Sequence, residues 1–360
     1  MFRFKKSIEK VNRTSNIEDR SQMKLKLDRN EKIIALDNNY KKKLNNHINK
    51  LDINLYPNLE PTYKKLSKFL GLNRKNILIT EGVSGAIKNI LDATQITNKT
   101  EIIIPNPSFA LYKVYSKIYD VKLKTFNYDN NFNLRINDIF KLVSKKTAIV
   151  FLTFPNIPVE GNINLSFINK LAKFLSKKKI LLVIDEVYFP FNKFSSLGLI
   201  KKFKNLVVMR SFSKAFGLAG ARIGYMVSEN NKIKNFSNTK GGYETNMLSA
   251  AALEFILENN IITKKYTSDV LKGLLFLKKE LKDLKIDSYG GVNSNFIFIN
   301  FKNKILAKKI YKKLNKNKIA VRYGYPKPFD KGILLTGCPL NEMKKFILVF
   351  KKIYKWKKFL

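Results

Sequence analysis

The strongest constraint on the fold is an alternation of wholly apolar segments with segments of helical periodicity between residues 76 and 211. The apolar segments, predicted as strands, are residues 77–80, 101–105, 147–153, 180–184 and 206–209. Apolar residues recur at helical spacing in residues 86–91, 109–119 and 165–175. Strands without polar alternation must be covered on both faces, and helices between them indicate parallel crossover connections. The pattern therefore predicts an α/β fold whose large domain has a mainly parallel sheet flanked by helices.

The pattern changes after about residue 242. Helices are predicted over residues 243–258, 263–284 and 305–314 and from 342 onward, with strands at 296–300, 319–321 and 333–336. This order predicts a smaller α+β domain at the C-terminal end. The first 50 residues are polar, rich in Lys and Asn, and only weakly periodic. We therefore expect an N-terminal arm over residues 1–50, a large domain over 51–245 and a small domain over 246–360.

The chain is strongly basic, with 69 Lys and Arg against 27 Asp and Glu, a formal net charge of +42. A charge of this size raises nucleic acid as a partner. However, only nine of the 69 basic residues are Arg, and the lysines are spread along the whole chain. A nucleic-acid surface favours Arg for bidentate contacts. We therefore interpret the lysines as solvated surface residues and expect no nucleic-acid partner, with nucleic-acid binding kept as the alternative from another class.

Rare residue types exclude several kinds of site. One cysteine, Cys338, and one histidine, His47, allow no disulfide framework, no Cys-rich metal site and no multi-His metal site. We therefore expect no metal. The N-terminal residues contain no apolar run of signal-peptide length, and no apolar segment is long enough to span a membrane. The expected location is the cytoplasm, without a membrane partner.

Polar residues with chemical potential follow four of the predicted strands. They are the Gly82 turn, the Asn156 loop, Asp185 and the segment Ser211–Lys214. In a doubly wound sheet, ligands bind at the carboxyl ends of the strands. These four groups are therefore expected to share one site.

The segment SFSKAFGLAGARIGY, residues 211–225, is the most informative of the four. A lysine between hydroxyls, followed by a Gly-rich turn and Arg222, suits a Schiff-base lysine beside a bound phosphate. Asp185 follows an apolar strand and is expected to be buried, so it needs a cationic partner. A protonated pyridine nitrogen would be such a partner.

These segments resemble the signature of fold-type I pyridoxal-phosphate aminotransferases, close to the histidinol-phosphate aminotransferase branch. The resemblance extends from Leu27 to the last predicted helix. It implies pyridoxal 5'-phosphate as cofactor and ping-pong transfer of an amino group from a small-molecule donor to a carbonyl acceptor. It also implies the fold of that family, a large cofactor-binding domain with a smaller C-terminal domain.

The resemblance gives roles to individual residues. Lys214 would form the Schiff base and then move the proton, Asp185 would pair with the pyridine nitrogen, and Tyr188 would hydrogen-bond the phenolic oxygen. The residues that would hold the phosphate are Ser211, Ser213, Arg222 and the backbone amides of Val83 and Ser84. The turn that contains Val83 departs from the family's Gly-Asn-Gly-Ser-Asp-Glu pattern, but backbone donors do not depend on the side chain.

Three further residues match positions of the family. Phe109 would stack on the cofactor ring, and Asn30 belongs to an N-terminal segment that covers the active site and would contact the substrate. Tyr56, in Leu55-Tyr-Pro57, matches a tyrosine that reaches the phosphate of the partner subunit. The resemblance therefore implies a homodimer with composite sites.

The loop from Phe154 to Gly161 departs from the family's Asn-Pro-Asn-Asn-Pro-Thr-Gly. The asparagine that contacts the phenolic oxygen falls on Ile157, and Asn156 could replace it only if the loop shifts. Loss of that donor would raise the pKa of the Schiff base, because hydrogen bonds stabilise the charged form.

A second departure concerns the substrate. Ile333 stands where the family's late strand, Leu-Arg-Ile-Ser-Ile-Gly-Thr, has an arginine that grips the substrate. Arg322 still matches a basic position of the family, and Lys327 and Lys331 are near in sequence. Either these three residues supply the contact to the anionic group, or the substrate has no carboxylate at that place. We expect Arg322, with the nearby lysines, to provide the anion site, Ile333 to widen the pocket or make it more apolar, and the substrate to differ from histidinol phosphate.

Two alternatives to an aminotransferase share the same signature. A decarboxylase of the threonine-phosphate type would use the same cofactor residues and differ in the bond that breaks at the α-carbon. A catalytically silent relative of the fold would keep the residues without turnover. Lys214, Asp185 and Arg222 argue against the silent protein, whereas Ile157 and Ile333 keep it open.

Overall fold

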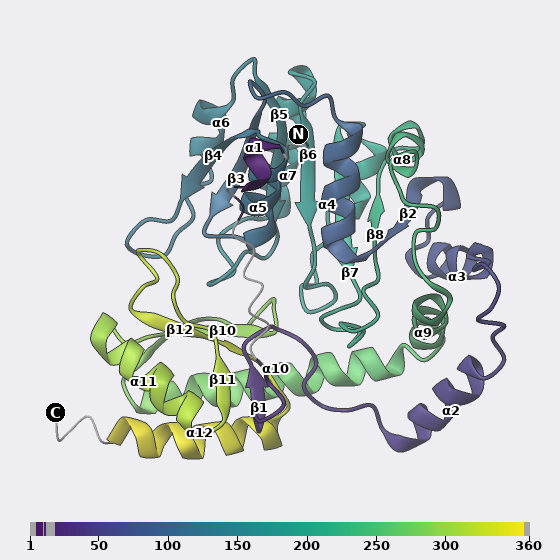
Figure 1. Ribbon diagram of the computed structural model, residues 1–360. Coiled ribbons are helices and arrows are strands. Elements are labelled where there is room, and N and C mark those ends of the chain that lie inside the picture. Colours follow the sequence, from purple (N-terminus) through teal and green to yellow (C-terminus); the bar gives the residue numbers. More distant parts are fainter. Residues whose placement is uncertain (1–4, 10, 12–18, 356–360) are drawn as a thin grey trace.

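A seven-stranded sheet lies in the upper part of Figure 1, which draws the computed structural model; the structure describes residues 5–9, 11 and 19–355. The strand order is β2-β8-β7-β6-β5-β3-β4, and only β8 runs antiparallel to its neighbours. The prediction of a mainly parallel sheet is confirmed. The strands are β2 (Ile77–Thr80), β3 (Glu101–Asn106), β4 (Lys122–Asn127), β5 (Thr147–Thr153), β6 (Leu181–Asp185), β7 (Leu206–Ser211) and β8 (Gly224–Val227).

Helices bury both faces of this sheet, which explains why its central strands are apolar throughout. In β5, Ile149 and Phe151 belong to one buried cluster, and Val150 and Leu152 belong to the other. The first cluster includes residues of α4 (Gly82–Ala93), α5 (Ala110–Ile118) and α8 (Asn230–Ser237). The second includes residues of α7 (Leu165–Lys177), α3 (Glu60–Leu70) and the short α6 (Asp138–Leu142).

A smaller antiparallel sheet has the order β12-β10-β9. Its strands are β9 (Asp287–Gly290), β10 (Phe296–Asn300) and β12 (Gly332–Thr336), and the helices beside it are α10 (Ile261–Asp283), α11 (Lys304–Lys316) and α12 (Leu340–Lys355). The packing of α10 requires glycine at position 273. A Cβ there would lie 1.9 Å from the carbonyl oxygen of Cys338.

The N-terminal segment joins the smaller sheet region. Strand β1 (Leu25–Leu27) pairs in parallel with β11 (Ile319–Val321), and α2 (Asn38–Ile48) contacts α9 (Met247–Glu258). A short helix, α1 (Lys6–Glu9), contacts α5. The expected arm therefore contributes a strand that pairs with a strand of the C-terminal half. The division into domains at residues 50 and 245 stays a prediction.

The structure also bears on the single cysteine, on metal binding and on membrane spans. Cys338 is fully buried, and burial raises the pKa of its thiol to about 12. Within residues 5–9, 11 and 19–355, no group of three or more His, Cys, Asp and Glu side chains is placed to hold a metal ion. None of the helices in the same part of the chain is both long and apolar enough to cross a membrane.

Candidate active site

A cavity of about 360 Å³ lies where β6 and β7 end and α4 begins. It brings together residues far apart in the sequence, from the N-terminal segment to Arg322. The predicted site residues that line it are Asn30, Val83, Ser84, Phe109, Asp185, Tyr188, Ser211, Ser213, Lys214, Arg222 and Arg322, and Ile157 lines it as well. Tyr56 and Asn156 are not among its lining residues.

Lys214 follows β7 in a turn that Ser211 stabilises, since the amide of Ser213 donates to Ser211 Oγ at 3.1 Å. The Lys214 amine donates to the backbone oxygen of Arg29 at 2.7 Å. Burial lowers the pKa of the amine from 10.5 to about 8, and the neighbouring Arg222 and Arg322 act in the same direction. A substantial share of the amine is therefore neutral near pH 8, as a nucleophilic lysine requires.

Asp185 is the last residue of β6 and is only 1% exposed. Its Oδ2 accepts a hydrogen bond from Tyr112 Oη at 2.8 Å, and its Oδ1 accepts one from the amide of Val187 at 3.1 Å. Burial raises the pKa of this carboxyl from 3.8 to about 7. No Lys or Arg within the described residues forms an ion pair with it. The carboxylate is therefore buried without a directly paired cation, and a protonated ring nitrogen would supply one.

The N-terminus of α4 and Arg222 form a cradle for an anion. Arg222 donates to Ser84 Oγ at 3.3 Å and to Ser213 Oγ at 3.5 Å. The N-cap residue, Glu81, makes no capping hydrogen bond with its side chain, so the first amides of the helix stay available. Gly82 has φ +64°, and a Cβ there would lie 3.1 Å from Arg222 Nη2. The close approach of helix and guanidinium therefore depends on a glycine.

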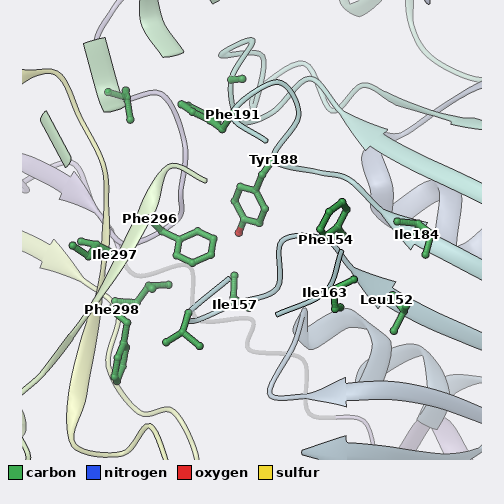
Figure 2. Close-up of a cluster of buried hydrophobic side chains, with 14 of the residues drawn as sticks. Leu152, Phe154, Ile157, Ile163, Ile184, Tyr188, Phe191, Phe296, Ile297 and Phe298 are labelled. Atoms are coloured by element: carbon green, nitrogen blue, oxygen red, sulfur yellow. The ribbon is translucent and has the colours of Figure 1, made fainter. Parts of the chain in front are cut away.

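Tyr188 and Asn30 meet at another wall of the cavity. Asn30 Nδ2 donates to Tyr188 Oη at 3.0 Å, and the Tyr188 ring contacts the Phe296 ring edge-on at 5.0 Å between centroids (Figure 2). Asn30 has φ +53° and is held by Thr336 Oγ1, which accepts its amide at 2.8 Å, and by Asn295 Nδ2, which donates to its carbonyl at 3.0 Å. The N-terminal segment is thereby fixed against the site.

Asn156 is fully buried outside the cavity. Its amide donates to the Pro107 carbonyl at 2.9 Å and to Tyr128 Oη at 2.8 Å, and its oxygen accepts from Ser108 Oγ at 2.8 Å. The side chain is committed to holding the loop, and the loop shift that a cofactor contact would need is not present. Ile157 lines the cavity in its place and lies beside Tyr188 and Phe296 in Figure 2.

Tyr56 lies at the surface, where it is 81% exposed and stacks on Tyr243 with ring centroids 5.1 Å apart. It does not reach the cavity of its own chain. This placement leaves the phosphate of a second subunit as the contact that the resemblance implies for it.

The expectation that Ile333 widens the pocket is wrong. Ile333 is 0% exposed and pairs with Ile299 across β12 and β10. Thr336 of the same strand contacts Asn30, so alternation along the strand places Ile333 on the opposite face. The face of β12 that carries Thr336 also carries Leu334 and no cation, so this strand offers no positive charge to a substrate.

Lys327 and Lys331 do not join the cavity either. They line a separate hollow together with Asn130, Lys302 and Asp330. Of the cations that the sequence placed near the substrate, Arg322 alone faces the site.

Arg29 is a cavity residue that the sequence analysis did not single out. Its side chain is 46% exposed, and its Nε lies 3.5 Å from Asp28 Oδ2. Asp28 and Glu31 also line the cavity and share Arg20, whose Nη2 lies 2.7 Å and 2.6 Å from their oxygens. The sequence did offer a signal for it: Arg29 is one of only nine arginines in the chain, and it directly precedes Asn30.

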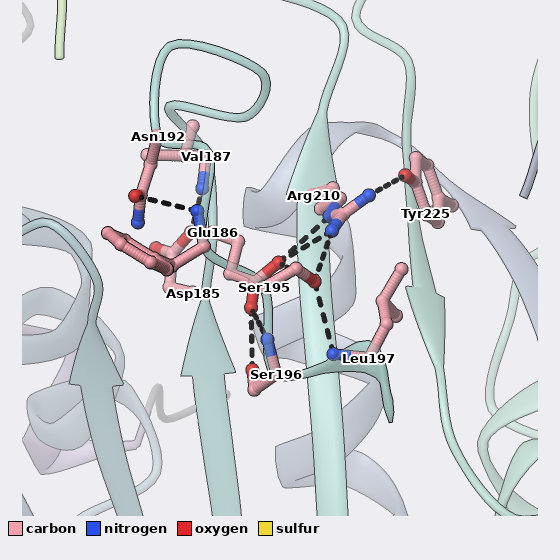
Figure 3. Close-up of polar contacts among 10 residues, drawn as sticks. Asp185, Glu186, Val187, Asn192, Ser195, Ser196, Leu197, Arg210 and Tyr225 are labelled. Carbon is pink, nitrogen blue, oxygen red and sulfur yellow. Dashed lines mark hydrogen bonds and ion pairs between the residues drawn. The ribbon is translucent and has the colours of Figure 1, made fainter. Parts of the chain in front are cut away.

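A buried ion pair supports the two strand ends that carry Asp185 and Ser211 (Figure 3). Arg210 donates to Glu186 Oε2 through Nε at 3.0 Å and through Nη2 at 2.8 Å, and both side chains are at most 3% exposed. Arg210 also donates to Tyr225 Oη at 3.3 Å. Glu186 and Arg210 are the sequence neighbours of Asp185 and Ser211, so the pair fixes β6 against β7 where the site begins.

The residues present fit pyridoxal 5'-phosphate. The cavity offers an amine of lowered pKa in Lys214, a buried carboxylate without a paired cation in Asp185, and an anion cradle at Arg222 and α4. These three features match the aldehyde, the ring nitrogen and the phosphate of that cofactor. Fold and site together define a pyridoxal-phosphate enzyme of fold type I.

Comparison with known proteins identifies the family. The family model for aminotransferase class I and II matches residues 23–337, and the chain belongs to this family. A histidinol-phosphate aminotransferase of Clostridium novyi is 31% identical over 304 residues, which cover 83% of each protein. The predictions of an aminotransferase and of an enzyme are therefore confirmed.

Two solved structures show the same fold. Histidinol-phosphate aminotransferase from Sinorhizobium meliloti, in complex with pyridoxal-5'-phosphate, has a TM-score of 0.88 at 20% identity and covers 99% of this chain and 98% of its own. L-threonine-O-3-phosphate decarboxylase from Porphyromonas gingivalis has a TM-score of 0.72 at 21% identity, with 92% and 99% covered. At these identities the likeness concerns the fold.

Proposed function

We propose that this aminotransferase holds pyridoxal 5'-phosphate through Lys214, Asp185 and the cradle at Arg222, and that it transfers an amino group between small molecules. The observation that carries the proposal is the joint lining of one cavity by these three residues, two of which have pKa values shifted by burial. When bound, the cofactor supplies an electron sink for bonds at the carbon that bears the amino group.

The residues of the chain divide the remaining work. Lys214 would hold the aldehyde carbon through Nζ, and its lowered pKa lets the free amine take and return a proton near neutral pH. Asp185 would keep the proton on the ring nitrogen, because a buried carboxylate favours a cationic partner. Tyr188 would donate to the phenolic oxygen, and Phe109 would lie against the ring.

The phosphate would be held at the other end of the same cavity. Ser211, Ser213, Arg222 and the amides of Val83 and Ser84 are its proposed ligands. Charge-assisted hydrogen bonds from Arg222 and the positive end of α4 both favour an anion there.

We expect a substrate with an anionic group, held by Arg322 together with Arg29. Arg322 is exposed in the cavity and lies over the Tyr325 ring at 5.5 Å, with no ion pair to a carboxylate of the described residues. Arg29 lines the same cavity, with its Nε 3.5 Å from Asp28. Asn30 would contact the substrate beside them. That histidinol phosphate is not this substrate stays a prediction.

The proposal includes a cytoplasmic homodimer. Exposed apolar side chains near Tyr56 support an interface: Ile53, Leu55, Tyr56, Tyr243 and Leu248 are between 46% and 81% exposed. A mainly apolar C2 interface of more than about 2,000 Å² would bury them and bring Tyr56 to the partner's phosphate site.

A decarboxylase remains the second candidate because the Porphyromonas gingivalis enzyme shares the fold. The same residues would hold the cofactor in both reactions. The products distinguish them, since decarboxylation releases carbon dioxide and transamination leaves the amino group on the cofactor.

The deciding experiment combines borohydride reduction with a donor panel. Reduction should fix the cofactor on Lys214 by mass spectrometry, and Lys214→Ala should lose this adduct and about 10² to 10⁴ in turnover. Lys234→Ala, on the exposed surface of α8, is the matched control. The panel contains L-glutamate, L-histidinol phosphate and O-phospho-L-threonine, each followed by cofactor absorbance and carbon dioxide release. An adduct on another lysine would refute the assignment.

A further inference from the structure

Glu160 connects the loop after β5 to the turn between β9 and β10. Its Oε1 accepts three hydrogen bonds from that turn: from the amides of Val292 and Asn293 at 3.0 Å and 2.9 Å, and from Ser294 Oγ at 2.6 Å. The residue is 9% exposed. One carboxylate oxygen thus joins a loop of the large sheet to a turn of the small sheet.

The backbone at Glu160 is in a conformation that few side chains adopt. Its φ is +71°, as is that of Gly161, and its carbonyl accepts the amide of Asn156 at 2.9 Å. A non-glycine residue in the left-handed region persists only where surrounding contacts hold it. The three hydrogen bonds from the turn are such contacts. Because they fix Glu160, they also restrict the loop that carries Ile157.

The turn continues directly into the active site. Asn295 follows Ser294, and its side chain donates to the carbonyl of Asn30 at 3.0 Å. Asn30 in turn donates to Tyr188 Oη, and the preceding carbonyl, that of Arg29, accepts the Lys214 amine. Four segments that are distant in sequence therefore form one hydrogen-bonded wall of the cavity.

We propose that Glu160 is a positioning residue that holds this wall: it fixes the turn at residues 292–294 and, through Asn295, the place of Asn30 against Tyr188. The proposal rests on the proposed function, because only then does the wall face the substrate. Glu160 itself contacts neither the substrate nor the cofactor. Its role is to keep the residues of this wall ordered before the substrate binds.

Hydrogen exchange followed residue by residue tests the connection without any substrate. In Glu160→Ala, the amides of Val292 and Asn293 lose their acceptor and should exchange at least about tenfold faster. The Asn30 amide, bonded to Thr336, should also exchange faster, although Glu160 does not touch it. In Glu160→Gln, the amide oxygen still accepts the three donors, so protection should be largely restored.

Kinetics of the holoenzyme give the second readout, with the best amino donor of the panel above. A loosened wall must be ordered by the substrate, so Glu160→Ala should raise KM about tenfold and change kcat less. Glu160→Gln should stay within about threefold of the wild type. Glu229→Ala is the matched control, since its carboxylate accepts the amide of Asn231 at the start of α8.

Glu160→Gly keeps the test decisive if the alanine variant does not fold, because glycine relieves the positive φ while it also removes the carboxylate. Faster exchange at Val292 and Asn293 with unchanged exchange at Asn30 and unchanged KM would overturn the proposal. Failure of borohydride to fix the cofactor on Lys214 in the wild type would instead refute the proposed function, and the exchange data would still decide on the connection.

Discussion

Buried ionisable side chains define the site at the scale of single residues. Asp185 and Lys214 lie in one cavity, and burial moves their pKa values toward each other, to about 7 and about 8. The charged form of each group is therefore less stable in the cavity than it would be in water. A ligand that offers a cation to Asp185 and a covalent partner to Lys214 relieves both costs.

The pH dependence of stability should reveal the burial of Asp185. The folded carboxyl has a pKa of about 7 against 3.8 in the unfolded chain, so the folded state holds more protons between these values. Its contribution to stability therefore falls as the pH rises from about 4 to about 7, by up to about 4 kcal/mol. Lys214 acts in the opposite sense between about pH 8 and 10.5, where stability rises with pH.

Urea unfolding of the cofactor-free protein checks this, with Asp185→Asn as the reference. The oxygen of an asparagine can still accept from the Val187 amide, its NH2 group can donate to the Tyr112 hydroxyl, and the side chain does not titrate. The wild type should lose stability relative to this variant as the pH rises from 5 to 7.5. A constant difference across that range would contradict the prediction.

The pair formed by Glu186 and Arg210 should behave as a buried unit. Glu186→Gln or Arg210→Met alone leaves the other charge without its partner and should cost about 3–5 kcal/mol of unfolding free energy. The double variant should lose clearly less than the sum of the two, as measured by denaturant unfolding. Additive losses would show that the pair is not coupled.

Most residues that line the site could be predicted because each lies in a short segment whose sequence pattern is recognisable. Lys214, Asp185 and Arg222 each follow a strand whose apolar run is visible in the sequence. Asn156 could not be placed, because its partners Pro107 and Tyr128 come from other parts of the chain. Ile333 matches the family's arginine position, but sequence alone does not tell which face of a buried strand points to the site, and here that face carries Thr336.

At the scale of elements, the prediction succeeded where burial is uniform. The structure has strands β5, β10 and β11 within the limits expected from the sequence. It also has β4 and β8, which were not expected. The edge strand β4 is only partly buried and contains Lys122 and Lys124, so its apolar signal is weak. Strand β8 is short and follows a Gly-rich turn directly.

The N-terminus of α4 makes a prediction about cofactor binding. Gly82→Ala should strain a φ of +64° and press a Cβ toward Arg222 Nη2. We expect a loss of about 1 kcal/mol in stability. We also expect about a tenfold weaker affinity for pyridoxal phosphate, because the contacts of Arg222 shift.

Absorbance titration of the cofactor-free protein measures this affinity. Gly198→Ala is the control, since nothing lies within 4 Å of a Cβ at that position and its φ is not positive. If both variants bind the cofactor alike, the helix N-terminus does not form the phosphate site.

At the scale of the whole molecule, net charge and apolar surface oppose each other. Two copies that each carry +42 repel, whereas the apolar patch around Tyr56 and Tyr243 favours association. Screening weakens the repulsion and leaves apolar burial largely unchanged. The subunits of the proposed homodimer should therefore associate more tightly as salt rises from about 20 to 200 mM.

Sedimentation equilibrium at several salt concentrations measures this trend. Tyr56→Ala should weaken the dimer at every salt concentration, whereas Leu348→Ala, an exposed residue on α12, should not. A monomer at micromolar concentration that binds the cofactor fully would contradict the composite site.

The state of Cys338 makes the protein convenient for spectroscopic labelling. A thiol reagent is attacked by the thiolate, and with a pKa of about 12 and no exposed surface this cysteine is nearly always protonated and out of reach. Because it is the only cysteine in the chain, a new one at an exposed position outside the proposed interface, such as Leu348→Cys, would take up a spin label alone. Distances between the two labelled subunits of the proposed dimer could then be measured without first replacing the native cysteine.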